Sequence, residues 1–196
     1  MPVYMVTGFM RSGTSMMMAA LEAGGLEAVF SEAQETRIAR QGDDFYLPQK
    51  HGLYELDQKE MQKPKFPSDY QGKLVKCLFG GVRNWFPQPD GIKVVVMRRN
   101  MEEIRQSHVA LYPNSQMTIE RIKQVTEVNF AHLQNRRDTT FVEVWYRDVI
   151  EDCAEGRLTQ FERIRDAGFP IDPEKAMSVV DPEFCRFKLE ELTIGI

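Results

Sequence analysis

The sequence predicts an α/β fold of three layers, in which helices cover both faces of a central, mostly parallel sheet. Four short apolar runs, rich in β-branched or aromatic residues, are the expected strands: 3–6, 74–78, 92–97 and 141–145. Segments with helical periodicity lie between or after these runs. This alternation is typical of a parallel sheet, because each strand must return to the same edge through a crossover connection.

The length and composition predict one globular domain over residues 1–196, with 42% of the residues hydrophobic and 28% charged. The chain has 25 basic and 29 acidic residues, which gives a formal net charge of −4. A protein without an overall basic surface is not expected to bind a nucleic acid backbone. Any anion site must therefore be local.

The cysteines and the apolar N-terminal run indicate the cellular compartment in which we expect the protein. Cys77, Cys153 and Cys185 are an odd set without CxxC spacing, which argues against a disulfide framework or a structural zinc site. The run at 3–6 lacks a preceding basic region and is too short for a signal peptide or a membrane span. We expect a reduced, cytoplasmic protein without a membrane segment.

The helices are predicted from apolar stripes and end signals. Segments with these features lie at 16–22, 101–111, 119–133 and 158–164. Gly168 follows the last of them, where glycine commonly ends a helix. Asp172 with Pro173, and Asp181 with Pro182, combine an N-cap residue with a proline at the first helical position. They predict two short helices near the end of the chain.

Residues 41–72 differ from the rest of the chain. This stretch mixes glycines and prolines with five aromatic residues, which favours a long, irregular excursion held by aromatic anchors. Long loops in compact domains often carry function. We therefore expect the excursion to face a substrate.

The strongest chemical signal is GFMRSGTS at residues 8–15, which follows the first predicted strand and precedes a helix. Gly8 and Gly13 stand five apart, as in the phosphate loop G-x-x-x-x-G-K-[ST], whose N–H groups bind an anion at a helix N-terminus. The lysine position is occupied by Thr14, and a cation lies inside the loop as Arg11. We expect Arg11 to lie beside a leaving phosphate. The alternative is a glycine-rich turn with Arg11 solvated.

A second signal follows the strand at 92–97, which ends in Arg98 and Arg99. Asn100 can cap the next helix, and Ser107 lies two turns into it. In an open α/β sheet, ligands bind outside the carboxyl ends of the strands, so these groups face the same crevice as the phosphate loop. The alternative is a pair of arginines that are solvated or bonded to a neighbouring carboxylate.

These two segments together resemble the sulfotransferase family. GFMRSGTS is similar to its 5′-phosphosulfate loop, of the type PRSGTS, and Arg99 and Ser107 have the spacing of its R-x-P-x5-S motif, which holds a 3′-phosphate. The chain further resembles small bacterial sulfotransferase-like proteins in four segments, at 47–55, 76–78, 146–153 and 179–182. The resemblance spans nearly the whole chain.

The resemblance implies a P-loop nucleoside triphosphate hydrolase-like fold and transfer of a sulfuryl group. The donor would be 3′-phosphoadenosine-5′-phosphosulfate, the acceptor a hydroxyl or amine of a small molecule, and the product adenosine 3′,5′-bisphosphate, with no metal. The donor-site residues carried over from the family motifs are Arg11, Ser12, Gly13, Thr14, Ser15, Arg99 and Ser107.

The catalytic base is not carried over, because Leu78 stands where the eukaryotic cytosolic branch has a histidine. Glu55 matches a glutamate of the bacterial proteins and is the first candidate, followed by His51. Lys76 could neutralise the sulfuryl oxygens. The alternatives are a solvated glutamate and an ordinary lysine at a strand end. His108 lies on the apolar stripe of its helix, where a satisfied buried imidazole is the commoner outcome.

Two other functions share these features. A small P-loop kinase acting on a metabolite would need a lysine at position 14 and a magnesium-binding carboxylate at a strand end, where this chain has Arg98 and Arg99. A nucleotide-binding module without catalysis would retain the donor site and lack the base, as Leu78 suggests.

Overall fold

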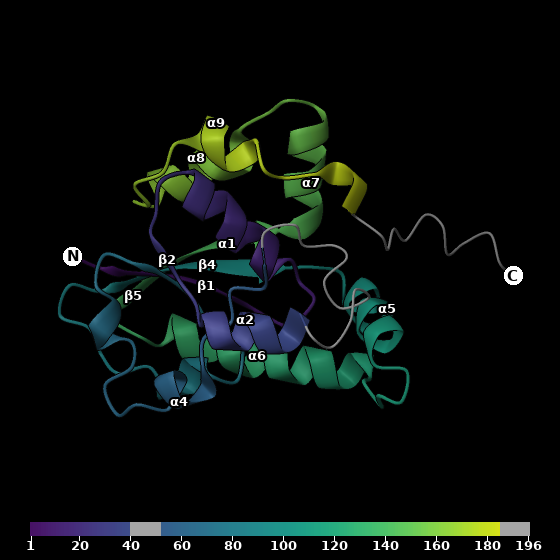
Figure 1. The fold of residues 1–196 in the computed structure, drawn as a ribbon, viewed down its shortest axis with the longest axis horizontal. Helices are drawn as coiled ribbons and strands as arrows, with labels where there is room; N and C mark the ends of the chain where they lie inside the picture. The colour runs from purple at the N-terminus through teal and green to yellow at the C-terminus, as the bar shows by residue number, and fades with distance from the viewer. Residues whose placement is uncertain (40–51, 185–196) are drawn as a thin grey trace, which may run out of the picture.

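The computed structural model describes residues 1–39 and 52–184 (Figure 1). Its five strands form one parallel sheet with the order β2-β3-β1-β4-β5. They are β1 (Val3–Gly8), β2 (Ala28–Val29), β3 (Leu74–Lys76), β4 (Ile92–Arg98) and β5 (Thr139–Trp145). The α/β fold class and the four expected strands are confirmed, and the two-residue β2 is an addition that carried no sequence signal.

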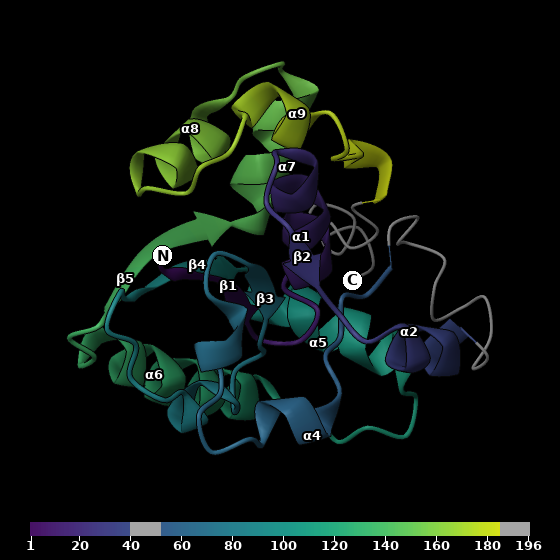
Figure 2. The same cartoon turned by 60° about the vertical axis from the view of Figure 1, so that its left-hand side comes forward.

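Helices cover both faces of the sheet, which makes three layers (Figures 1 and 2). The helices on one face are α1 (Thr14–Ala23), α7 (Tyr146–Ala154), α8 (Thr159–Asp166) and α9 (Pro173–Met177). Those on the other side are α2 (Glu32–Ala39), α4 (Gln58–Met61), α5 (Met101–Leu111) and α6 (Ile119–Gln134). Three short 3-10 turns are η1 (Ser68–Tyr70), η2 (Val82–Asn84) and η3 (Pro182–Phe184).

The buried side chains of β1 show how the sheet serves both layers. Tyr4 and Val6 belong to the core beneath α1, α7, α8 and α9, whereas Val3 and Met5 belong to the core beneath α6. Successive side chains of a strand point to opposite faces, so a strand buried on both faces needs a continuous apolar run. The run at the start of the sequence satisfies this requirement.

The predicted helix ends are largely confirmed. Asn100 accepts hydrogen bonds from the backbone N–H groups of Glu102 and Glu103, and Asp172 caps α9 in the same way. Gly168 follows α8 with a φ of 89°. The segment after Asp181 is the 3-10 turn η3 rather than an α-helix. Helices α2 and α7 were not expected from the sequence.

The described part of the excursion is more regular than the sequence indicates. It contains α4, which begins at the N-cap residue Asp57, and the turn η1. Tyr54 and Phe66 are buried, which confirms that aromatic residues anchor the segment. Residues 41–51 lie outside the described part of the chain.

Within the described residues, no helix has both the length and the apolar character needed to cross a membrane. Cys77 and Cys153 are free thiols, and Cys185 lies outside the described residues.

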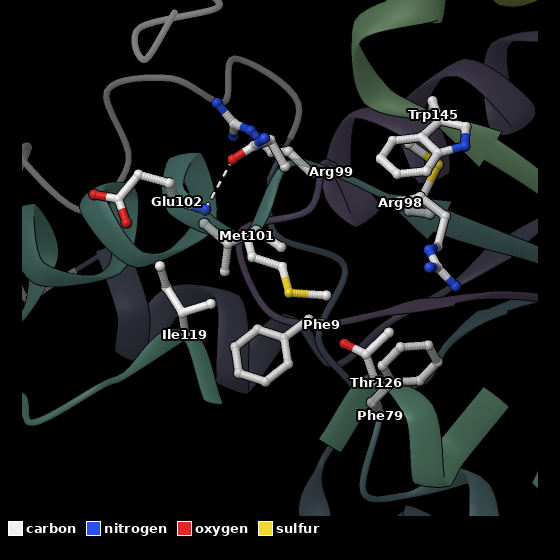
Figure 3. Close-up of a pocket in the computed structure, with 12 residues that line it drawn as sticks. Phe9, Phe79, Arg98, Arg99, Met101, Glu102, Ile119, Thr126 and Trp145 are labelled. Carbon is white, nitrogen blue, oxygen red and sulfur yellow. Dashed lines mark hydrogen bonds between the residues drawn. The ribbon is translucent and has the colours of Figure 1, made fainter. Parts of the chain in front are cut away.

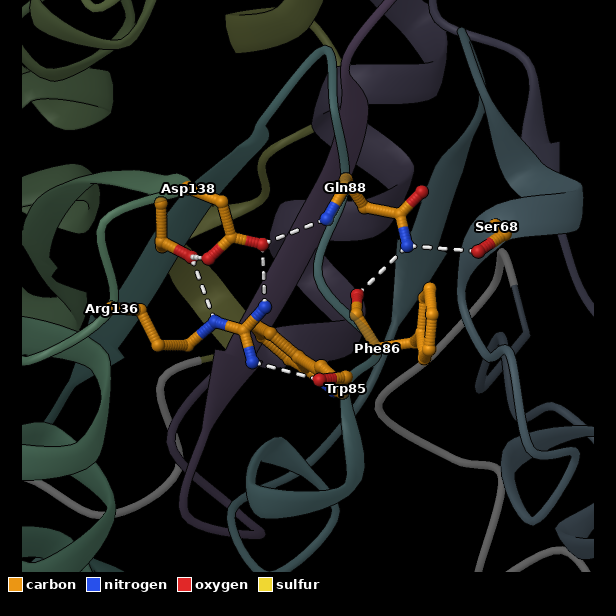
Figure 4. A network of polar contacts seen from close by, with 7 residues as sticks. Ser68, Trp85, Phe86, Gln88, Arg136 and Asp138 are labelled. Atoms are coloured by element: carbon orange, nitrogen blue, oxygen red, sulfur yellow. Dashed lines mark hydrogen bonds and ion pairs between the residues drawn. The ribbon is translucent and has the colours of Figure 1, made fainter.

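A polar network joins segments at the amino end of β5 (Figure 4). The carboxylate of Asp138 accepts a hydrogen bond of 2.6 Å from the Arg136 guanidinium and one of 2.9 Å from the backbone N–H of Gln88. The Gln88 amide in turn donates to the hydroxyl of Ser68, and Arg136 donates to the carbonyl of Trp85. The network therefore fixes the segments before β4 and β5 against η1.

Replacing Asp138 by asparagine should lower the free energy of unfolding at pH 7 by about 2 kcal/mol, the range for hydrogen bonds to a charged group. Burial raises the pKa of Asp138, but the bonds from Gln88 and Arg136 outweigh it and hold the pKa below its ordinary value. This stabilisation is complete above the unfolded pKa of about 3.9 and is lost as the pH falls through the folded pKa.

Urea unfolding between acidic and neutral pH measures both effects. Asp138→Asn should flatten the acid limb, and the exposed control Asp166→Asn should not. An unchanged acid limb in Asp138→Asn would contradict the role of this carboxylate.

Candidate functional site

The loop between β1 and α1 requires glycine at both of its ends. A Cβ on Gly8 would lie 2.6 Å from the hydroxyl of Ser12 and 2.8 Å from the carbonyl of Met97, and a Cβ on Gly13 would collide with the ring of Tyr146. Gly13 also has a φ of 93°, which side chains rarely tolerate. Arg11, between them, has a φ of 69°. The chain thus makes a tight turn that ends at the start of α1.

The N-terminus of α1 has the features of an anion site. The N-cap is Gly13, which has no side chain to bond the first N–H groups, and the first turn contains no acidic residue. Thr14 and Ser15 are buried there. Unbonded N–H groups and the positive end of the helix dipole favour a phosphate or sulfate group at such a position.

Lys76, the last residue of β3, connects this loop to the excursion. Its ammonium donates hydrogen bonds to the Ser15 hydroxyl at 2.9 Å, the Leu53 carbonyl at 2.6 Å and Glu55 Oε1 at 2.7 Å. The Lys76 side chain is 3% exposed and that of Glu55 is 26% exposed. The structure therefore brings together three of the predicted site residues, Ser15, Glu55 and Lys76, from three separate elements.

Burial lowers the pKa of the Lys76 ammonium, and the nearby Arg11 lowers it further, although the Glu55 carboxylate opposes both effects. Desolvation disfavours the charged form of a lysine, and an anion within bonding distance favours it. The Glu55 carboxylate, with a smaller contribution from Glu35, therefore favours the charged form of Lys76 at this buried position.

Arg11 connects the loop to α5. Its Nε donates to the hydroxyl of Ser107 at 2.9 Å, and its carbonyl accepts a hydrogen bond of 3.1 Å from Arg99 Nη1. Arg99 also donates through Nε to Glu103 at 2.9 Å, and its guanidinium lies 4.4 Å from the centre of the Tyr146 ring. Arg99 and Ser107 thus lie beside the phosphate loop, as expected, and their role toward a 3′-phosphate stays a prediction.

Sequence reasoning missed Glu35 on α2. Its carboxylate accepts hydrogen bonds from the backbone N–H groups of Leu53 at 2.9 Å and Glu55 at 3.0 Å. The hydroxyl of Tyr54 donates to Glu22 at 2.5 Å, and Tyr54 itself has a φ of 58°. Burial and the Glu22 carboxylate raise the pKa of Tyr54. Segment 53–55 is thus held by α1 and α2. The contacting residues are far apart in the sequence, so no local sequence pattern predicts these contacts.

The remaining candidates have different outcomes. His51 lies outside the described residues. His108 is buried, as expected, but its Nδ1 has no hydrogen-bond partner among the described residues, and burial lowers its pKa. The buried hydroxyl of Ser12 is in the same situation within the described chain.

Comparison with known proteins adds little to this geometry. No protein-family model and no curated protein matches the sequence. Among solved structures, the chain is similar to an unliganded sugar kinase from Janibacter sp. HTCC2649, with 13% identity and a TM-score of 0.43 over 92% of this chain and 98% of the other. A likeness at this level carries no argument about function.

We expect the Lys76–Glu55 pair to contribute to the free energy of unfolding of the protein. Glu55→Gln removes the anion that pairs with a buried ammonium and should lower the free energy of unfolding by about 3 kcal/mol, the lower end of the range for a buried pair, because Glu55 is 26% exposed. The double variant Lys76→Met/Glu55→Gln should recover part of this loss, because it removes the buried charge as well.

The matched control is Glu27→Gln, which breaks the exposed Lys73–Glu27 pair at the same 2.7 Å distance and should cost about 0 to 1 kcal/mol. Urea unfolding of the four proteins measures these differences. Equal losses in Glu55→Gln and Glu27→Gln would show that burial of Lys76 does not govern the pair.

Proposed function

We propose that the protein transfers a sulfuryl group from 3′-phosphoadenosine-5′-phosphosulfate to a hydroxyl or amine of a small molecule. The observation that carries the proposal is the 2.9 Å hydrogen bond from Lys76 to Ser15. In a P-loop kinase, the hydroxyl at this position ligates Mg²⁺. A cation already bonded to that oxygen repels a second, divalent cation, so the arrangement favours a donor held by protein cations.

The ends of the neighbouring strands support the same proposal. β1 lies between β3 and β4, which end in Lys76 and in Arg98 followed by Arg99. A kinase of this architecture needs a carboxylate near such a strand end to help hold magnesium. Here both neighbouring strands present positive charge at the carboxyl edge, next to the anion-binding loop.

The side chains of the site suit the charge changes of sulfuryl transfer. When the acceptor oxygen or nitrogen bonds to sulfur, the bond from sulfur to the bridging oxygen breaks and its electron pair passes to the leaving phosphate. Arg11 would stabilise that phosphate, and Lys76 would stabilise the sulfuryl oxygens. Glu55 is the first candidate to take the acceptor's proton, because its Oε2 has no hydrogen-bond partner among the described residues.

Arg99 and Ser107 are the proposed ligands of the donor's 3′-phosphate. Arg99 is paired with Glu103, and both side chains are less than one-tenth exposed. A phosphate at Arg99 would therefore compete with the Glu103 carboxylate or share the guanidinium with it. Ser107 already bonds Arg11, so both ligands are connected to the loop that would hold the other end of the donor.

Calorimetric titration with adenosine 3′,5′-bisphosphate without metal, and in parallel with ATP and Mg²⁺, tests the donor class. The proposal expects micromolar binding of the bisphosphate and much weaker binding of ATP with magnesium. Preference for ATP with magnesium would replace the proposal by the kinase function. Binding of neither nucleotide would contradict both functions.

The 3′-phosphate assignment has its own variant. Arg99→Ala should weaken bisphosphate binding by roughly 1.5 to 3 kcal/mol, because it removes a charge-assisted hydrogen bond. Arg105→Ala, on the helix that follows Arg99 and paired with Glu102, is the control and should bind normally. Equal affinity of Arg99→Ala and the unmodified protein would show that the phosphate lies elsewhere.

A further inference from the structure

A cavity lies on the α6 side of the sheet, at the carboxyl ends of β4 and β5 (Figure 3). Its volume is about 360 Å³, within the range of pockets that bind small molecules. Most of its wall is apolar and comes from Phe9, Phe79, Met101, Ile104, Ile119 and Trp145. We call it the α5–α6 pocket, because α5 and the N-terminal half of α6 supply five of its lining residues.

Arg98 is one of the charged residues of the pocket wall. It pairs in register with Trp145 on the neighbouring strand, and its guanidinium lies 5.6 Å from the Trp145 ring centre and 5.2 Å from that of Phe130. The two rings hold the guanidinium by cation–π contact. Its place at the rim of an apolar cavity is therefore fixed before any ligand arrives.

The hydrogen-bonding capacity of Arg98 is unused by the described part of the chain. A guanidinium has five N–H donors, yet no described residue accepts a hydrogen bond from the guanidinium of Arg98. Its described anionic partner is Glu143, at 3.4 Å, which is long for a charge-assisted bond. A carboxylate can bond two guanidinium donors at once, with better geometry than Glu143 achieves here.

The other charged groups of the wall are more fully engaged. Arg99 pairs with Glu103 and bonds the carbonyl of Arg11, and Glu102 accepts two hydrogen bonds from Arg105. Arg98 is therefore the wall cation best placed to accept a new anion.

We propose that the α5–α6 pocket binds a small amphipathic carboxylate. Its apolar body would contact Phe9, Met101 and Ile119, and its carboxylate would bond Arg98 in place of Glu143. Arg99, a proposed ligand of the donor's 3′-phosphate, also lines this pocket, so the two sites adjoin. The carboxylate is proposed to bond Arg98 and not Arg99, so failure of 3-phenylpropionate binding leaves the donor proposal standing.

Calorimetry with three probes tests the ligand class. 3-Phenylpropionate combines an apolar ring with a carboxylate, 3-phenylpropanol lacks the charge, and acetate lacks the apolar body. We expect 3-phenylpropionate to bind with a dissociation constant on the order of 1 mM or tighter. The alcohol should bind roughly tenfold more weakly, and acetate should show no saturation below about 10 mM.

Substitutions of Arg98 and of Glu143 should change the affinity for 3-phenylpropionate in opposite directions. Arg98→Gln should weaken 3-phenylpropionate binding roughly tenfold, because it removes the guanidinium. Glu143→Gln should strengthen binding a few-fold, because it removes the competing carboxylate. A gain of affinity cannot result from damage to the fold, so this variant keeps the test decisive if Arg98→Gln is unstable.

A matched pair on α6 tests the location. Ile119 and Val128 are 38% and 39% exposed, and of the two only Ile119 lines the pocket. Ile119→Glu should weaken 3-phenylpropionate binding by charge repulsion, and Val128→Glu should leave it unchanged. Tryptophan fluorescence gives a second readout, because Trp145 lines the pocket and is 44% exposed, whereas Trp85 is buried. The fluorescence emission of the unmodified protein should change when 3-phenylpropionate binds. The emission of Trp145→Phe should not change.

The proposal is overturned by absence of saturable 3-phenylpropionate binding up to about 10 mM, a range that covers weak small-molecule sites. It is equally overturned if the alcohol binds as tightly as the acid, or if Arg98→Gln and Glu143→Gln both leave the affinity unchanged.

Discussion

The ammonium of Lys76 lies at the end of a buried strand, and three segments meet around it. An ion in a protein interior loses its hydration and must be compensated by hydrogen bonds and an opposite charge. Ser15 on the phosphate loop, the Leu53 carbonyl and the Glu55 carboxylate provide this compensation. The position of segment 53–55 against the N-terminus of α1 therefore depends on one buried charge.

Two further carboxylates, on α1 and α2, also hold segment 53–55 in place. Glu35 bonds two backbone N–H groups of the segment, and Glu22 bonds the hydroxyl of Tyr54. Among the described residues, Arg11 and Tyr54 are the non-glycine residues with positive φ, and both lie at this site. Backbone conformations of this kind persist where surrounding contacts over-determine them, and they often occur at functional sites. Here the contacts are those that join α1, α2 and β3.

The distribution of charge is compatible with the anion site that we propose for an acidic chain. The protein has a formal net charge of −4, yet Arg11, Lys76, Arg98 and Arg99 gather at the carboxyl edge of the sheet. Each has a specific partner, among them Ser107, Glu55, Glu143 and Glu103. The fold therefore gathers four cations at one edge of the sheet in a chain that is acidic overall, and their partners hold the cations in place.

The sequence by itself determined the α/β fold, the four longer strands, the caps at Asn100 and Asp172 and the turn from Gly8 to Gly13 that contains Arg11, because these features depend on residues close together in the chain. It also placed Arg99 and Ser107 near that loop, since parallel strands end at one edge. Only the tertiary structure decided that Lys76 bonds Ser15 and Glu55, that Glu35 holds segment 53–55, and that Arg98 lines a pocket. These contacts join residues 18 or more positions apart or depend on how helices pack, and local patterns carry no information about such distances.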